Sequence, residues 1–335
     1  MNIQENISLK KYNTFGIDVL AKKFVSINFL HELKEVVSTE KDIFILSGGS
    51  NMLLTQDINK LVVHINNKGI CIDNQDDNFV YITVNAGENW HDFVLWCVNQ
   101  NYGGIENLSL IPGNVGTCPI QNIGAYGIEV KDVITKVEAL EIATSKLRTF
   151  SEEECKFGYR NSVFKNELKG KYIITSVSFK LTKKNHKLNT SYGAIESELI
   201  ERGITKPNIK DISNAVISIR NAKLPNPKEI GNSGSFFKNP VITKEHFLKL
   251  VEKFKNIPSY IISETEIKVP AGWLIETAGF KGKRFNDAGV HTKQALVLVN
   301  YGNASGKEIF NLAKKIQEEI LNMFEIKLEI EVNII

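Results

Sequence analysis

Three stretches of the chain carry side chains suited to acid–base or anion chemistry. The first is GNSGSFFKNP (231–240), in which Ser235 lies between a glycine-rich turn and two phenylalanines. A neutral serine is a weak acid, so it can protonate only a strongly basic acceptor such as a carbanion, and only from a fixed position beside it. The phenylalanine rings would help to keep water away from such a donor. Taken alone, the stretch also fits an ordinary turn serine.

The second stretch, CKFGYRNSVFK (155–165), places Tyr159 and Arg160 side by side after a glycine. A guanidinium can bind a carboxylate or an enolate through two parallel hydrogen bonds, and an aromatic neighbour can form a wall that excludes water. A solvated arginine in a surface turn is the alternative.

The third stretch is the carboxyl-terminal IKLEIEVNII, whose strict alternation predicts a strand with Glu331 on its polar face. Taken alone, Glu331 also fits an ordinary charged side chain on the solvent-facing side of a strand.

Two loops rich in small residues are suited to hold phosphate groups through backbone N–H groups. SGGSN (47–51) directly follows the apolar stretch at 42–46, although a plain turn would look the same. IPGNVGTCPIQNIGAYG (111–127) holds four glycines and two prolines in seventeen residues, and long structured loops of this kind are usually functional. Four residues within it would fix the backbone so that N–H groups converge: Pro112, Gly113, Gly116 and Pro119. Three others add polar side chains: Thr117, Gln121 and Asn122. A cofactor that carries a pyrophosphate is the ligand we expect.

Other nucleotide-binding motifs are excluded by their spacing. GNASGK (302–307) has three residues between its glycines where a Walker loop needs four, and Glu308 follows where a serine or threonine should hold magnesium. No G-x-G-x-x-G follows a predicted strand, so a dinucleotide would not be bound on a Rossmann unit.

Composition limits the class of protein. Lys and Arg number 41 against 38 Asp and Glu, without a basic block, so neither a nucleic-acid groove nor a membrane patch is expected. No apolar run approaches the roughly 18 to 20 residues of a membrane span, and no apolar stretch follows the charges of the amino terminus, so we expect no signal peptide. We expect a cytoplasmic monomer that acts on small molecules. The four cysteines lack metal-site spacing, which predicts no metal and a role as small apolar fillers.

The elements that must position these groups are those of a mixed α/β protein. Periodicity predicts strands at 42–46, 61–65, 79–85, 135–142 and 171–181, and helices at 89–100, 191–202 and 211–222. A Pro, Asn and Gly cluster after this region predicts a domain boundary near residue 224. Beyond it we expect a smaller α/β unit with helices at 243–255, 271–278 and 304–324, a strand at 294–300 and the terminal strand.

Seven motifs, in this order and at these spacings, closely resemble the UDP-N-acetylenolpyruvoylglucosamine reductase family over almost the entire chain. They are NTFGI (13–17), ILSGGSNML (45–53), IPGNVGTCPIQNIGAYG, GYRNSVF, GNSGSFFKNP, AGWLIETAGFKG (271–282) and AGVHTKQALVLVN (288–300). The resemblance implies a fold of the vanillyl-alcohol-oxidase type, with two FAD-binding subdomains and a C-terminal α/β substrate-binding domain. The corresponding ranges are 1–66, 67–223 and 224–325, followed by a terminal strand at 326–335.

The resemblance also implies an activity. The family converts UDP-N-acetylenolpyruvoylglucosamine to UDP-N-acetylmuramate for bacterial peptidoglycan, with NADPH as the reductant and bound FAD as the carrier. A hydride passes from the flavin N5 to the methylene carbon of the enolpyruvyl group, and a proton goes to the carbon next to the carboxylate. An arginine aimed at the intervening enolate would stabilise the transition state more than the ground state.

Residue roles follow from the matched motifs. Ser235 matches the proton donor, Arg160 the arginine that stabilises the enolate, and Glu331 the glutamate that assists. The positions implied for FAD are Gly48, Gly49, Ser50, Asn51, Pro112, Gly113, Gly116, Thr117, Gln121, Gly124 and Tyr126. Those implied for the substrate are Tyr159, Tyr192, Lys223, Asn239 and Gln294. Tyr192 lies in a loop (189–199) typical of the longer of the two forms of the family.

Two departures and two alternatives stand beside this interpretation. Thr117 and Cys118 replace two serines of many relatives, and only four residues follow Glu331. An oxidase of the same fold would pass electrons to oxygen instead. A non-catalytic UDP-sugar-binding protein is disfavoured by the coexistence of Arg160, Ser235 and Glu331, since a binding module has no use for a proton donor.

Overall fold

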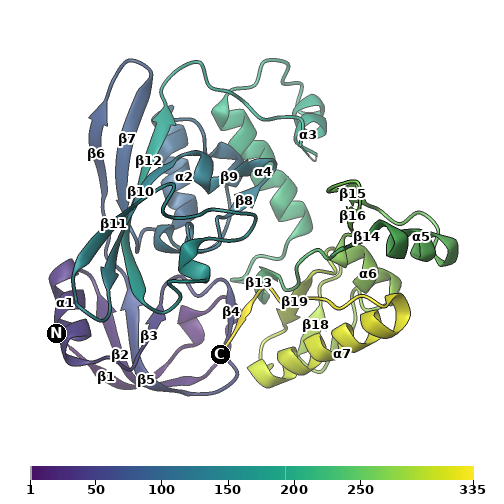
Figure 1. Ribbon diagram of the computed structural model, residues 1–335, viewed down its shortest axis with the longest axis horizontal. Coiled ribbons are helices and arrows are strands. Elements are labelled where there is room, and N and C mark those ends of the chain that lie inside the picture. The colour runs from purple at the N-terminus through teal and green to yellow at the C-terminus, as the bar shows by residue number, and fades with distance from the viewer. Residues whose placement is uncertain (1, 193) are drawn as a thin grey trace. The chain divides into compact units, whose positions relative to one another are not determined.

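The computed structural model describes residues 2–192 and 194–335 (Figure 1). The chain forms two compact units, each assembled from segments that are distant in sequence. Unit 1 consists of Met1–Ile7, Ala21–Gly48 and Ile58–Ala222, and unit 2 of Ser8–Leu20, Gly49–Asp57 and Lys223–Ile335. The sequence-based boundary near residue 224 lies beside the division at Ala222 and Lys223, and the finer division into four parts stays a prediction.

The first sheet of unit 1 has the strand order β1-β2-β5-β3. Its strands are β1 (Gln4–Ser8), β2 (Leu20–Ile27), β3 (Ile43–Leu46) and β5 (Ile58–Ile65). Because β2 and β3 both run parallel to β5, the chain must cross over between them, and α1 (Leu30–Thr39) makes one crossover. The apolar side of α1 is buried against both sheets of the unit through Leu33, Val36 and Val37.

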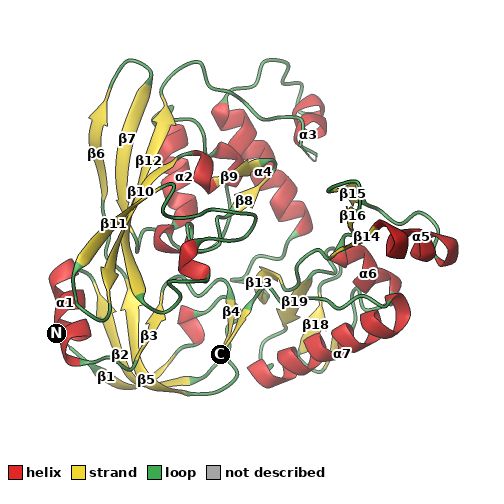
Figure 2. Cartoon of the chain, viewed as in Figure 1, coloured by secondary structure: helices red, strands yellow, loops and turns green. Residues whose placement is uncertain are grey.

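The second sheet of unit 1 is antiparallel, with the order β11-β10-β12-β7-β6 (Figure 2). Its strands are β6 (Ile70–Gln75), β7 (Phe79–Asn85), β10 (Ile134–Glu141), β11 (Leu147–Ser151) and β12 (Tyr172–Thr182). The sequence alternation of β7 is confirmed, since Val80, Ile82 and Val84 are buried. α2 (Trp90–Asn99) starts at the cap Asn89 and packs on this sheet, with the ring of Phe93 5.1 Å from that of Phe179.

The remainder of unit 1 builds the loops of interest. A short hairpin of β8 (Gly124–Ala125) and β9 (Ile128–Glu129) ends the long loop, and α3 (Ile195–Glu201) packs with α4 (Ile209–Lys223) around a small apolar cluster. Single 3-10 turns in the chain lie at Lys10–Tyr12, Glu106–Leu108, Val115–Thr117, Val130–Asp132 and Val163–Lys165.

Unit 2 contains an antiparallel sheet of order β13-β19-β18-β17 and a smaller one of order β14-β16-β15. The strands are β13 (Gly231–Ser235), β14 (Val241–Thr243), β15 (Tyr260–Ile261), β16 (Glu266–Lys268), β17 (Arg284–Phe285), β18 (Ala288–Val290) and β19 (Val297–Asn300). The helices are α5 (Lys244–Lys253), α6 (Ala271–Thr277) and α7 (Gly306–Phe324). The apolar residues of α7 recur at helical spacing, and all but Met323 of the stripe Ile309, Leu312, Ala313, Ile316, Ile320 and Met323 are buried. The capping box of Ser305 and Glu308 starts the helix.

The carboxyl-terminal segment differs from the predicted strand. Its alternation is confirmed in burial, because Ile326, Leu328 and Val332 are buried while Lys327 and Glu329 are exposed. Only β20 (Asn333–Ile334) is a regular strand, and it pairs in parallel with β4 (Met52–Leu53). The segment changes partner along its length, since residue 330 bridges residue 237 before the chain reaches β4. A continuous strand is therefore the wrong description.

The cysteines only partly follow the prediction. Cys97, Cys118 and Cys155 are buried, as expected of apolar fillers, but Cys71 is exposed on β6, so that interpretation is wrong for it.

Within residues 2–192 and 194–335 no group of three or more His, Cys, Asp or Glu side chains could hold a metal ion. No helix in the described part of the chain is long and apolar enough to cross a membrane.

His64 on β5 predicts an acid-sensitive fold. Burial, with the Lys68 charge as a smaller cause, lowers its pKa from 6.5 to about 4, and Nδ1 lies 3.0 Å from the Ser26 hydroxyl. Because the unfolded chain binds this proton more tightly, the stabilisation is complete above pH 6.5 and is lost as the pH falls toward about 4. We expect the loss to reach about 2–3 kcal/mol. The free energy of unfolding, measured with urea between pH 6.5 and about 4, should depend less on pH in His64→Gln than in the wild-type protein. An equal pH dependence in the two proteins would contradict the prediction.

Candidate active site

The two glycine-rich loops meet in unit 1. A methyl group at Gly48 would lie 2.9 Å from the Cα atom of Gly113 and 3.1 Å from the backbone N of Asn114. Only glycine allows two backbones this close approach, so Gly48 brings the two loops side by side. The rest of SGGSN belongs to unit 2, where the Gly49 carbonyl accepts a hydrogen bond of 3.1 Å from the backbone N–H of Thr14.

The long loop is held rigidly by hydrogen bonds to the start of α2. The Trp90 N–H donates to the Gly113 carbonyl at 3.0 Å, and the Gly116 N–H donates to the Ala86 carbonyl at 2.9 Å. At Gly116 a methyl group would come within 2.5 Å of the Ala86 Cβ, so this glycine is required for packing. These contacts support a preformed cradle at the positions predicted for FAD.

The departure at residues 117 and 118 has a structural explanation. The Thr117 hydroxyl donates to the Asn114 carbonyl at 2.7 Å, so it closes the turn. Cys118 belongs to the apolar core of unit 1, and burial raises the pKa of its thiol far above the ordinary value. A hydroxyl at residue 118 would point into this core.

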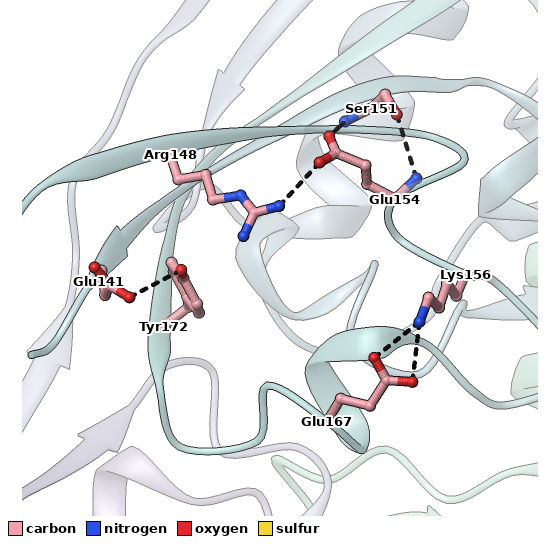
Figure 3. Close-up of polar contacts among 7 residues, drawn as sticks. All are labelled: Glu141, Arg148, Ser151, Glu154, Lys156, Glu167 and Tyr172. Atoms are coloured by element: carbon pink, nitrogen blue, oxygen red, sulfur yellow. Dashed lines mark hydrogen bonds and ion pairs between the residues drawn. The ribbon is translucent and has the colours of Figure 1, made fainter.

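Tyr159 and Arg160 form the tip of a tight turn. Gly158 and Asn161 exchange two backbone hydrogen bonds of 3.1 Å, which leaves the two residues between them at the end of the turn. Figure 3 shows polar contacts in the chain on either side of this turn: both Glu167 carboxylate oxygens accept from Lys156, and Glu154 accepts from Arg148 and from the Ser151 N–H. Tyr159 is 60% exposed, and its ring centroid lies 5.5 Å from the guanidinium carbon of Arg160.

Side-chain hydrogen bonds join the Arg160 turn to the long loop. The Arg160 guanidinium donates to the Gly124 carbonyl at 2.7 Å, and the Ser162 hydroxyl donates to the Ile120 carbonyl at 2.6 Å. The Asn122 amide donates to the Gly158 carbonyl at 3.0 Å. Unit 1 therefore brings the predicted anion-binding arginine to the loop predicted for FAD, although the two are far apart in sequence.

Backbone strain gathers in the same region. Four residues other than glycine have φ in the left-handed region, which is uncommon for bulky side chains: Leu110 (59°), Asn122 (44°), Tyr126 (50°) and Arg160 (53°). Such strain persists only where surrounding contacts fix it, and it is concentrated at functional sites. This clustering supports a ligand site at the ends of the loop.

Tyr192 also lies near this loop. A methyl group on Gly127 would be 3.4 Å from its Cβ, and the Asn107 amide donates to the Asn189 carbonyl at 2.9 Å and to the Tyr126 carbonyl at 3.2 Å. The Tyr192 side chain is 57% exposed. The predicted covering tyrosine is thus held by its own loop beside Tyr126 rather than buried in the fold.

Ser235 is presented by a β-bulge in unit 2. Asn232 faces Val299 of β19, but Ser235 faces Val297, so one extra residue is accommodated in β13. Gly234 takes φ of +69° in the bulge. Phe236 and Phe237 are fully buried while Ser235 is exposed, which corrects the expectation that these rings keep water away. They anchor the strand in the core of the unit, and the bulge turns the serine outward.

Glu331 lies beside this serine strand. Its backbone N–H donates to the Phe236 carbonyl at 2.9 Å, and the Lys238 N–H donates to the Glu329 carbonyl at 2.9 Å. The carboxyl-terminal segment therefore runs antiparallel to residues 236–238, which places the backbone of Glu331 next to the residue that follows Ser235. The backbone segments that carry Ser235 and Glu331, two predicted catalytic residues far apart in sequence, are therefore neighbours.

Two of the other substrate positions predicted in unit 2 lie at the start of α6. The side-chain Oδ1 of Asn239 accepts a hydrogen bond of 2.9 Å from the Ala271 N–H, the first residue of α6, so this contact fixes the orientation of the Asn239 amide. The Gln294 Oε1 would be 3.2 Å from a methyl group on Gly272. Lys223 is exposed at the end of α4. No described contact joins it to the other two.

Comparison with known proteins decides the family. The family model of the UDP-N-acetylenolpyruvoylglucosamine reductase C-terminal domain matches residues 226–335, and that of an FAD-binding domain matches residues 30–151. The UDP-N-acetylenolpyruvoylglucosamine reductase of Flavobacterium johnsoniae is 59% identical over 337 residues, covering 100% of both chains. The chain belongs to the UDP-N-acetylenolpyruvoylglucosamine reductase family.

Other reductases of this family agree over the full length. The enzyme of Pseudomonas putida is 46% identical and covers 99% of this chain and 98% of its own. The crystal structure of the Thermus caldophilus reductase superposes with a TM-score of 0.71 at 24% identity, covering 100% of this chain and 99% of that one. The mixed α/β fold expected of an FAD-binding reductase with a C-terminal α/β domain is confirmed.

Sequence reasoning missed residues that position the reductase site. Asn122 was singled out only as a polar side chain, yet it contacts Gly158, Glu129 and the backbone of Lys131. Arg220 lies on α4 close to Tyr126 and Arg160 and was not predicted. A single arginine in a helix carries no local signal, whereas an asparagine in a glycine-rich loop does suggest unusual backbone geometry.

Replacing Gly234 by alanine tests the bulge. Space is open around it, but an alanine at φ +69° costs about 1–2 kcal/mol and should move Ser235. We expect kcat to fall by about 10²-fold, as for a misplaced reacting group. Gly279→Ala is the matched control in the same unit, with φ +77° and only an ordinary contact of 3.7 Å to Lys283. Urea unfolding should show equal destabilisation of the two variants, and steady-state kinetics should show a fall in kcat only for Gly234→Ala. Equal kcat values in the two variants would contradict the role of the bulge.

Proposed function

We propose that this protein is the FAD-dependent, NADPH-consuming reductase that converts UDP-N-acetylenolpyruvoylglucosamine to UDP-N-acetylmuramate in peptidoglycan precursor synthesis. The observation that carries the proposal is Ser235, turned outward by a bulge, on a strand paired with the segment that bears Glu331. A proton donor and a carboxylate carried on paired backbone segments would serve a reaction that ends with proton transfer to carbon. A binding protein has no need of that pair.

The residues of unit 1 fit the cofactor. Gly48 and Gly113 approach too closely for any side chain, and Gly116 packs against Ala86, so glycines bring together the two loops that we propose to hold the pyrophosphate. FAD held by these loops would supply hydride transfer from NADPH to the enolpyruvyl carbon. Tyr126 and Gly124 lie at the end of the same loop, where they would contact the ring system.

Arg160 would stabilise the negative charge that develops on the substrate. Its guanidinium is already oriented by the bond of 2.7 Å to the Gly124 carbonyl, so little rearrangement is needed when the enolate forms. Tyr159 and Tyr192 supply exposed rings that can cover the substrate and reduce its contact with water.

Ser235 would give its proton to the carbon next to the carboxylate, and Glu331 would assist by polarising the acid or by guiding the returning proton. Lys223 suits the substrate diphosphate as a point charge, and Asn239 and Gln294 offer amide groups to the nucleotide sugar.

We also infer a cytoplasmic monomer, because NADPH and nucleotide sugars are cytoplasmic metabolites and one chain carries all three catalytic residues.

An anaerobic titration tests the proposal. NADPH is added to the yellow holoprotein, and UDP-N-acetylenolpyruvoylglucosamine follows once the flavin absorbance has bleached. Recovery of the absorbance only after the second addition supports the reductase. Recovery only on admission of air would identify an oxidase, and the absence of bleaching would leave a binding protein.

A further inference from the structure

The first turn of α2 holds the entrance to the long loop. The indole N–H of Trp90 donates to the Leu108 carbonyl at 2.9 Å, and its backbone N–H donates to the Gly113 carbonyl at 3.0 Å. Between these two contacts, Nδ1 of His91 accepts a hydrogen bond of 2.9 Å from the N–H of Leu110. Two consecutive residues of one helix therefore fix the start of the loop that we propose to hold FAD.

Leu110 needs this support because its backbone is strained. Its φ of 59° lies in the left-handed region, which is uncommon for a bulky side chain. Its carbonyl accepts a hydrogen bond of 3.2 Å from Nε of Arg220 on α4. The N–H and the carbonyl of this one residue are thus each held by a side chain from a different helix. Such a conformation persists only while the surrounding contacts hold it.

The hydrogen bond to Leu110 requires a neutral His91. A ring nitrogen that accepts from a backbone N–H carries no proton, so the neutral ring has its proton on Nε2. A second proton would bind at Nδ1, facing the Leu110 N–H, and the bond would be lost. Burial lowers the pKa of His91, the Asp92 charge opposes this and the Arg220 charge adds to it. The position near the start of α2 also disfavours a positive charge.

We propose that neutral His91 is a positioning residue for the cofactor: it holds Leu110 in the left-handed conformation that gives the long loop its FAD-binding shape, and protonation of its ring releases the loop. The side chain acts on FAD only through the backbone of the loop. This inference rests on the proposed function in one respect, since it requires FAD in the long loop.

The test is release of FAD from the purified holoprotein, followed at equilibrium by the rise in flavin fluorescence on dilution. We expect the affinity of the wild-type protein for FAD to be constant above the ordinary histidine pKa of 6.5 and to fall below it. The direction follows from linkage. The FAD-bound loop requires the neutral ring, so the released loop binds the proton more tightly and acid favours release.

Two substitutions separate the hydrogen bond from the charge. His91→Asn places an amide oxygen close to the position of Nδ1, so the Leu110 N–H keeps an acceptor that does not titrate. This variant should bind FAD as tightly as the wild-type protein does above pH 6.5, and it should keep that affinity in acid. His91→Leu leaves the N–H unpaired, which should weaken FAD binding about tenfold at every pH.

His64→Gln is the matched control. His64 is also in unit 1 and also has a lowered pKa, but its Nδ1 lies 3.0 Å from the Ser26 hydroxyl, away from the loop. This variant should release FAD with the pH dependence of the wild-type protein. A pH-independent affinity in His64→Gln would assign acid release to unfolding of unit 1 and would overturn the inference.

Two other outcomes would also overturn it and make His91 an ordinary half-buried histidine. One is a wild-type pH dependence in His91→Asn, and the other is an unchanged affinity in His91→Leu. If the wild-type protein binds no flavin, the proposed function fails. If flavin is bound and reduced by NADPH but its release does not respond to these substitutions, only the role of His91 fails.

Discussion

Ser235→Ala should slow reoxidation of the NADPH-reduced protein by the enolpyruvyl substrate about 10²–10⁴-fold, the usual contribution of a positioned general acid. Reduction by NADPH should be nearly unchanged, because that half-reaction requires no proton transfer to carbon. The fold should also be unchanged, since the side chain is exposed at the end of β13. Anaerobic stopped-flow measurement of the two half-reactions separates these effects.

Two further variants sharpen the test. Ser235→Cys should keep part of the activity, because a thiol is also a proton donor. Ser233→Ala is the matched control: its hydroxyl lies 3.2 Å from that of Thr14 and donates to the Met52 carbonyl at 3.3 Å, so its loss should cost about 1 kcal/mol of stability without affecting the proton step. Equal damage to both half-reactions in Ser235→Ala would make the serine a structural residue.

Arg160→Lys is expected to reduce the rate of the same substrate half-reaction about 10²–10³-fold, which is typical of losing one preorganised donor to a developing oxyanion. Lysine keeps the charge, but it cannot reproduce a planar donor that binds the Gly124 carbonyl and an anion together. The loss should fall mainly on kcat rather than on KM, because the charge that Arg160 stabilises is greatest in the transition state.

The control for this change is Arg148→Lys, on β11 in the same unit. Arg148 is half exposed and pairs with Glu154, so its replacement should alter neither half-reaction, as is usual for a surface ion pair. A rise in KM alone for Arg160→Lys would assign the arginine to substrate binding and would contradict a role in stabilising the enolate.

Local patterns in the sequence predicted much of the fold. The stripe of α7 apart from the exposed Met323, the alternation of β7 and the Thr243 cap of α5 all follow from residues close together in the chain, and the structure confirms them. Errors arose where a distant partner decides the outcome. The terminal segment has the burial pattern of a strand, but its hydrogen bonds go first to residues 236–238 and then to β4, which interrupts the strand.

The candidate site shows the same division. Motif order and spacing alone determined the family, the cofactor class and the residues proposed for catalysis, because these are properties of side-chain identity along the chain. The NTFGI motif was recognised without a role; in the fold the Asn232 N–H donates to the Thr14 carbonyl and the Asn300 amide to the Phe15 carbonyl, so it supports the serine strand.

Only the tertiary structure decided how those residues are held. The bulge at Gly234 exposes Ser235, the terminal segment brings Glu331 beside Phe236, and the Gly124 carbonyl orients Arg160. Each of these depends on hydrogen bonds between residues that are far apart in sequence, and such bonds leave no periodic signal. The sequence states which groups can do the chemistry, whereas long-range backbone pairing determines which of them stand together.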